Sequence, residues 1–145
     1  MERAIAAAKA AGQAGEVPVG AVVTGPDGTV LAVAANEVER RADPLAHAEM
    51  LALSAARARG GEKYLLACTL TVTLEPCALC AAAMAALRVG RVVFGAYDPK
   101  GGAVEHGPRL FEQPTIHHRP EVIGGVREAE CAALLREFFG DKRRA

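Results

Sequence analysis

The chain has 145 residues, 51% of them hydrophobic and 23% charged, and its 17 basic side chains balance its 17 acidic ones. This composition fits one globular domain over residues 1–145 and excludes a disordered protein. The neutral balance argues against a general nucleic-acid coat, although it allows a local basic patch. Because no apolar run could span a membrane and the start lacks a signal-peptide layout, we expect a soluble, cytoplasmic protein.

The first part of the chain predicts a helix followed by a β-hairpin. Residues 3–14 are alanine-rich with one apolar face, which is typical of an amphipathic helix. The β-branched run 17–23 predicts a buried strand, and the turn signal at 26–28 leads into the returning strand 29–34. Asn36 lies just past the hairpin, where its side chain can face a pocket or simply satisfy the loop.

A second helix is predicted from Asp43 to about Arg59. Asp43 is a favourable N-cap, and the proline that follows it suits the first position of a helix. The first turns of this helix carry His47 and Glu49. Taken alone, the pair is most simply a histidine at a helix start and a solvated glutamate.

The next segments predict a strand, an apolar helix and another strand. Residues 69–74 alternate in polarity and are β-branched, and they lead through Glu75 and a proline into the helix 77–87. This helix is apolar all round, so we expect it to be buried against the sheet, a helix or another subunit. Residues 91–96 form the next predicted strand, which ends just before Asp98.

The remainder of the chain is less regular. Prolines interrupt residues 103–120, residues 121–123 predict a short edge strand, and residues 126–139 predict a last helix before a basic tail at 142–144. Strands that alternate with helices favour an α/β fold with helices on both faces of one sheet. We therefore expect a three-layer α/β/α sandwich with a central mixed sheet of about five strands, similar to the cytidine deaminase fold.

Two separate helix starts together offer the ligands of a metal site. Cys77 and Cys80 are one helical turn apart, a spacing that suits half a zinc site or a redox dithiol. His47 adds a third ligand, and three ligands leave the fourth tetrahedral position open to water, as in catalytic zinc. Glu49 is then the natural proton shuttle. The other cysteines and histidines lack a partner motif, and we expect buried thiols at Cys68 and Cys131 and surface side chains at His106, His117 and His118.

These motifs together resemble a known family. His47-Ala48-Glu49 and Glu75-Pro76-Cys77-Ala78-Leu79-Cys80 each open a helix, and the combination resembles the zinc-dependent cytidine and deoxycytidylate deaminases. Within that superfamily, the chain is similar to the bacterial deaminases that convert the wobble adenosine of tRNA to inosine. The narrower resemblance spans nearly the whole chain and rests on the segments 16–22, 43–49, 73–77, 90–96 and 130–139.

The resemblance implies hydrolytic deamination and a specific zinc site. By position, His47, Cys77 and Cys80 would hold one Zn²⁺ per subunit, and Glu49 would be the proton donor.

The resemblance also implies contacts to substrate and to a second subunit. Asn36 would hydrogen-bond the flipped base, Asp98 would contact the nucleotide beside it, and the backbone N–H near Ala48 would help to hold the base or the water. The partners would be a tRNA anticodon loop and a second copy of the chain, whose contact would explain the apolar helix 77–87.

Departures from the family and two alternatives remain at this point. Leu45 stands where threonine is usual, and Tyr97 where arginine is common, so the departures concern substrate recognition and not the metal. One alternative is a deaminase of a free base or nucleoside, such as guanine or cytosine, which the neutral charge mildly favours. The other is a zinc-stabilised binding module without activity, which a three-ligand site disfavours.

Overall fold

One mixed sheet of five strands organises the computed structural model, which describes residues 1–144, and side chains through Asp141. The strand order is β2-β1-β3-β4-β5. The antiparallel pairs are β1 with β2 and β1 with β3, whereas β3, β4 and β5 run parallel. The strands are β1 (Gly20–Thr24), β2 (Val30–Ala35), β3 (Thr69–Leu74), β4 (Arg91–Ala96) and β5 (Glu121–Ile123).

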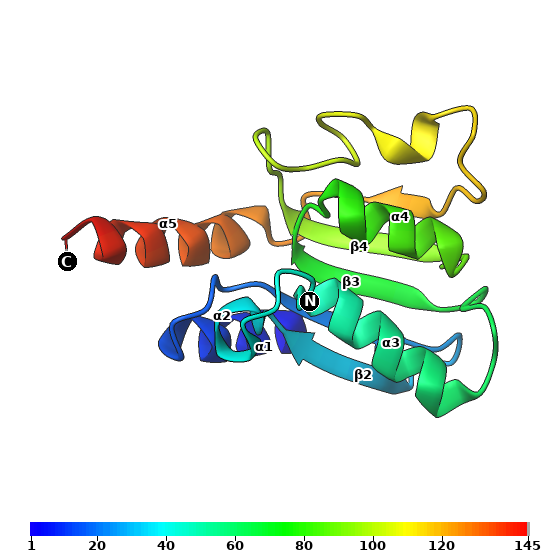
Figure 1. Ribbon diagram of the computed structural model, residues 1–145, viewed down its shortest axis with the longest axis horizontal. Helices are drawn as coiled ribbons and strands as arrows, with labels where there is room; N and C mark the ends of the chain where they lie inside the picture. The colour runs from blue at the N-terminus through cyan, green and yellow to red at the C-terminus, as the bar shows by residue number, and fades with distance from the viewer. Residues whose placement is uncertain (145) are drawn as a thin grey trace.

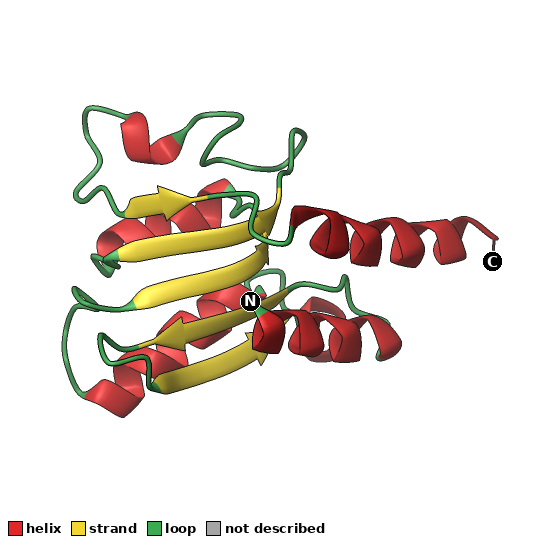
Figure 2. Ribbon diagram, turned by 180° about the vertical axis from the view of Figure 1, so that it is seen from behind, coloured by secondary structure: helices red, strands yellow, loops and turns green. Residues whose placement is uncertain are grey.

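Helices cover both faces of this sheet, so the predicted three-layer α/β/α sandwich is confirmed. The helices α3 and α4 lie on one face, and α1 and α5 on the other, with α5 extending past the sheet (Figure 1 and Figure 2). Among the described residues, no helix combines the length and the apolar character of a membrane span. The helices are α1 (Glu2–Gln13), α2 (Val38–Arg41), α3 (Ala48–Gly60), α4 (Ala78–Ala86), α5 (Glu128–Arg144) and the 3-10 turn η1 (Leu110–Glu112).

The main core lies between the sheet and the α3–α4 layer. Leu53, Leu70, Met84 and Phe94 are fully buried there, and each such side chain stabilises the fold by about 1.5–3 kcal/mol relative to an exposed one. A smaller cluster on the other face packs α1 and α5 against the sheet, and it contains Ile5, Ala96 and Cys131. Cys68 and Cys131 are buried free thiols, as predicted.

Several element boundaries match the sequence prediction, and others differ. The strands at 69–74, 91–96 and 121–123 are confirmed, and β5 lies at the sheet edge as expected. The helix α5 begins two residues later than predicted, and the short α2 and η1 were not predicted. The predicted basic tail at 142–144 has side chains outside the described part of the chain.

The predicted start of the α3 helix at Asp43 is wrong. The Asp43 carboxylate instead accepts a hydrogen bond from the Leu45 backbone N–H at 2.9 Å, which makes a local turn. The chain then stays extended at His47, with ψ of 147°, and α3 begins at Ala48. His47 is therefore the N-cap residue of α3 and is not inside the helix.

Candidate metal centre and active site

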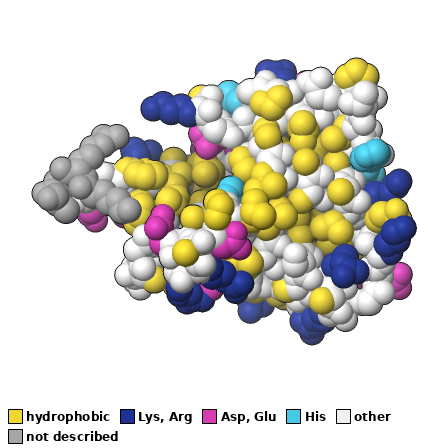
Figure 3. All heavy atoms as spheres, in the orientation of Figure 1, with side chains coloured by type: hydrophobic (Ala, Val, Ile, Leu, Met, Phe, Trp, Pro, Cys, Tyr) yellow, Lys and Arg dark blue, Asp and Glu magenta, His cyan; other side chains and the backbone are white. Residues whose placement is uncertain are grey.

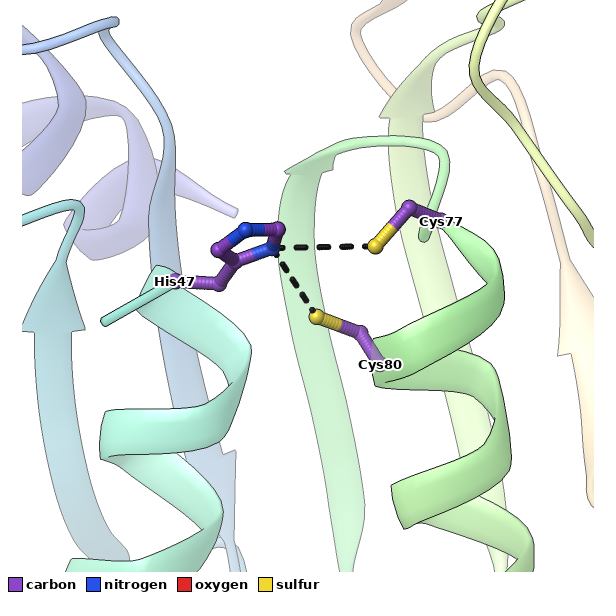
Figure 4. A group of neighbouring side chains, drawn as sticks. All are labelled: His47, Cys77 and Cys80. Atoms are coloured by element: carbon purple, nitrogen blue, oxygen red, sulfur yellow. Dashed lines mark hydrogen bonds between the residues drawn. The ribbon is translucent and has the colours of Figure 1, made fainter. Parts of the chain in front are cut away.

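The N-terminal ends of α3 and α4 lie side by side (Figure 4). His47 is the N-cap of α3, Cys77 is the N-cap of α4, and Cys80 lies in the first turn of α4 (Figure 4). Cys77 is also extended, with ψ of 174°, so its helix begins at Ala78, one residue later than predicted. Because helix N-termini favour negative charge, this placement stabilises thiolates.

The three side chains fit one tetrahedral zinc ion. The Nδ1 atom of His47 lies 3.6 Å from the Cys77 Sγ and 3.4 Å from the Cys80 Sγ (Figure 4). Standard zinc bond lengths place a nitrogen and a sulfur ligand about 3.5 Å apart in a tetrahedral site. The three ligand atoms lie within 4.8 Å of one another, and among the described residues no other side chain joins this group. Three ligands leave one position for water, which indicates a catalytic site.

The electrostatics of the two thiols also suit a metal. The pKa of Cys77 is lowered to about 5, chiefly by a hydrogen bond from Cys80 and further by His47. The same hydrogen bond and burial raise the pKa of Cys80. The pair therefore already favours one thiolate at neutral pH, and a bound zinc ion would keep both thiols deprotonated.

Glu49 is buried beside this group. Its residue is 5% exposed, so the interpretation of a solvated glutamate that the His47–Glu49 pair suggests alone is wrong. Burial raises the pKa of the Glu49 carboxyl to about 7, a range suited to proton transfer at neutral pH. Glu49 lies in the first turn of α3 and lines the same cavity as His47 and Cys77.

A cavity of about 310 Å³ opens over these side chains. Asn36 and Asp98, the residues expected to contact substrate, both line it. The Asn36 Oδ1 accepts a hydrogen bond from the Ala48 backbone N–H at 2.8 Å, and its Nδ2 donates to the Val17 carbonyl at 3.3 Å. Asn36 is thus held rigidly at the cavity wall, while the Ala48 N–H is engaged by Asn36.

A second cavity, of about 520 Å³, is larger and lies between α1, β2 and α2. It shares Asn36 with the first cavity, but none of the three candidate ligands lines it. We therefore place the candidate site in the smaller cavity, which His47, Cys77 and Glu49 line.

Two buried carboxylates shape the walls of this cavity, and sequence reasoning missed their structural roles. Glu16 accepts hydrogen bonds from the backbone N–H groups of Glu39 at 3.0 Å and Arg40 at 2.7 Å, so it anchors α2 at the rim. Glu75 accepts several N–H donors from the loop after β4, and although burial alone would raise its pKa, those donors lower it. The available sequence signal was an acidic residue directly beside a buried strand.

Comparison with known proteins agrees with this site. A family model described as the cytidine and deoxycytidylate deaminase zinc-binding region matches residues 1–96, so the chain belongs to that deaminase family. The tRNA-specific adenosine deaminase of Agrobacterium fabrum is 48% identical over 143 residues, which cover 99% of this chain and 93% of that protein. The tRNA-specific adenosine deaminase of Bacillus subtilis is 44% identical over 144 residues, which cover 99% and 89%.

A solved structure places the chain within one group of that family. It comes from a study of A-to-I editing by tRNA:A34 deaminases at the wobble position of transfer RNA. It superposes with a TM-score of 0.90 and 47% sequence identity, over 93% of this chain and 97% of that one. Within the deaminase family, the chain thus groups with the tRNA-specific adenosine deaminases, and the predicted resemblance, fold and zinc-dependent class are confirmed.

Proposed function

We propose that this protein catalyses the hydrolytic deamination of adenosine to inosine at the wobble position of a tRNA anticodon. One observation carries the proposal: His47, Cys77 and Glu49 line one cavity, and the buried Cys80 completes a group of three zinc-type ligands, in a chain that matches tRNA-specific adenosine deaminases over nearly its full length. His47, Cys77 and Cys80 would hold the ion. Zinc held there supplies a Lewis acid that lowers the pKa of a water molecule to about 7.

The side chains of the protein perform the remaining steps. Glu49 accepts one proton from the water and delivers it to the ring nitrogen of adenine, and it then transfers the second proton, from the added hydroxyl, to the leaving amine. The water oxygen forms a bond to C6, the bond from C6 to the amino nitrogen breaks, and ammonia leaves. The burial of Glu49 keeps bulk water from competing for the proton.

Three further residues position the substrate in this proposal. Asn36, fixed by its two protein hydrogen bonds, presents a polar side chain to the flipped base, and Asp98, which lines the same cavity, contacts the adjoining nucleotide. The hydrogen bond from Ala48 to Asn36 couples the start of α3 to this wall, so Ala48 would act on substrate through Asn36.

A direct assay separates this function from the alternative of a free-base or nucleoside deaminase. Purified zinc-loaded protein is incubated with an anticodon stem-loop carrying ACG, and separately with adenosine, guanine and cytosine. We expect inosine at the first anticodon position of the stem-loop and little turnover of the small molecules. Turnover of guanine or cytosine, with an unreacted stem-loop, would instead establish the alternative.

We also propose that two copies form a homodimer through α4. The inner side of this helix is buried, but Ala78, Leu79, Ala82 and Ala86 on its other side are exposed in the single chain. Hydrophobic side chains gather over the α3–α4 face (Figure 3). A contiguous apolar surface of this kind marks an interface.

A single domain over residues 1–145 and a cytoplasmic location also stay predictions.

A further inference from the structure

The Glu75 carboxylate lies at the centre of a hydrogen-bond cluster beside the site. Glu75 directly follows β3, precedes the Pro76-Cys77 segment, and has a fully buried side chain. Its Oε2 accepts backbone N–H groups from Val104 at 3.2 Å, Glu105 at 2.9 Å and His106 at 3.1 Å. These three donors are consecutive, so one oxygen fixes a full turn of the loop that follows β4.

The other oxygen of the same carboxylate holds both ends of that loop. The Glu75 Oε1 accepts the Asp98 backbone N–H at 3.0 Å and contacts the His106 ring Nδ1 at 2.8 Å. Because an ionised carboxylate can only accept, Nδ1 must carry the proton and donate it. Asp98 and His106 are thereby drawn to one point, and the loop 98–106 closes around Glu75.

The backbone of this loop packs directly against the carboxylate. A Cβ atom added at Gly102 would lie 2.5 Å from the Glu75 carboxyl carbon and 2.5 Å from the Asp98 carbonyl oxygen, so only glycine fits there. The next residue, Ala103, donates its N–H to the Pro76 carbonyl at 2.9 Å. The loop is therefore attached to the segment that carries Cys77, and it presents Asp98 and Gly101 to the cavity.

We propose that Glu75 and His106 are a positioning pair that holds the loop 98–106 against the zinc-ligand segment and thereby fixes the substrate wall formed by Asp98. The inference rests on the proposed function for its effect on tRNA. Five protein donors occupy the carboxylate oxygens of Glu75, so we assign it a positioning role, and His106 acts through Glu75. His106, with a side chain 34% exposed, can be substituted without opening the core.

The test compares His106→Ala with His106→Asn, because the asparagine amide can donate from nearly the position of Nδ1. Glu112→Gln is the control, because Glu112 is an exposed carboxylate on η1, just after the loop 98–106. The first readout is hydrogen exchange at the backbone amides of Asp98, Val104 and Glu105. We expect His106→Ala to speed exchange by about fivefold, the scale of one lost hydrogen bond, with wild-type rates in the other two variants.

The second readout is binding of the anticodon stem-loop, measured by fluorescence anisotropy in a Glu49→Ala background so that no turnover occurs. We expect His106→Ala to raise Kd by about fivefold with unchanged zinc content, and His106→Asn to restore binding. Faster exchange with an unchanged Kd would show that the pair only supports the loop, and it would overturn the proposal. Unchanged exchange in His106→Ala would overturn it as well. If the wild-type protein fails to bind or deaminate the stem-loop, the proposed function is wrong. The exchange rates still test whether Glu75 and His106 hold the loop 98–106.

Discussion

At the residue scale, the Glu49 carboxyl and the Cys80 thiol lie at the same candidate metal site, and the proposed function gives them separable roles. Cys80 is fully buried and would be a ligand, whereas Glu49 is buried next to the ligands without belonging to the ligand group. A ligand determines whether metal is held, and a proton shuttle determines only how fast the reaction proceeds. Substitutions at the two positions therefore distinguish the assignments.

We expect Glu49→Ala to retain zinc and to lose deamination by about 10²- to 10⁴-fold, the usual contribution of general acid–base catalysis. Cys80→Ser should lose zinc and activity together, because a hydroxyl replaces a thiolate ligand. Cys68→Ser is the control, since Cys68 is a buried thiol outside the ligand group and should keep the metal. Zinc content by mass spectrometry and inosine formation are measured on the same samples.

Either of two results would contradict these assignments. A zinc-replete and active Cys80→Ser protein would remove Cys80 from the ligand set. A Glu49→Ala protein with wild-type activity would remove the proton shuttle, whatever its zinc content.

At the element scale, α1 packs against β1 at backbone distance. The two elements approach so closely that a Cβ added at Gly20 would lie 2.0 Å from the Ala4 carbonyl oxygen and 2.8 Å from the Ala8 backbone nitrogen. These are backbone atoms, which cannot move aside as the end of a flexible side chain can. Gly20 is required because no other residue permits this helix–sheet contact.

We expect Gly20→Ala to destabilise the protein by about 2–3 kcal/mol, the upper range for overpacking in a well-packed core. The free energy of unfolding is measured by chemical denaturation monitored by circular dichroism. Gly60→Ala, at the last residue of α3 with no heavy atom within 4 Å of the added Cβ, is the control and should leave stability nearly unchanged. Equal denaturation midpoints for Gly20→Ala and Gly60→Ala would contradict the packing argument.

At the scale of the whole molecule, the outer side of α4 is an exposed apolar surface. The sequence predicts a helix buried all round, and the single chain buries only its inner residues, such as Cys80 and Met84. Leu79 on the outer side is 38% exposed and is surrounded by alanines of the same helix. Small side chains allow a second copy to approach closely.

We expect Leu79→Asp to convert a dimer to a monomer, because it places a charge in the centre of the apolar contact. Light scattering coupled to size-exclusion chromatography measures the mass. Phe139→Asp, on α5 in the opposite layer and 43% exposed, is the matched control and should remain dimeric. A wild-type protein that is monomeric at all concentrations would refute the proposed dimer, and a dimeric Leu79→Asp protein would place the contact elsewhere.

Local chemistry determined much of this protein in advance. The strands at 69–74 and 91–96 were predictable to the residue because their side chains alternate or run apolar, a pattern that neighbouring residues carry by themselves. The candidate ligands were predictable because Cys-x-x-Cys and a histidine at a second helix start leave few other uses for those side chains. The start of α3 was not predictable, because the Asp43 side chain accepts the Leu45 N–H in a local turn and does not cap the helix.

Only the tertiary structure decided what surrounds these residues. The burial of Glu49, the attachment of Asn36 to α3, and the five donors around Glu75 all come from segments far apart in the chain. Sequence patterns record interactions within a few residues, whereas burial and the capture of backbone N–H groups depend on which segments the sheet brings side by side. The sequence by itself therefore determined which atoms could bind the metal, and the fold determined how the walls of the neighbouring cavity are held.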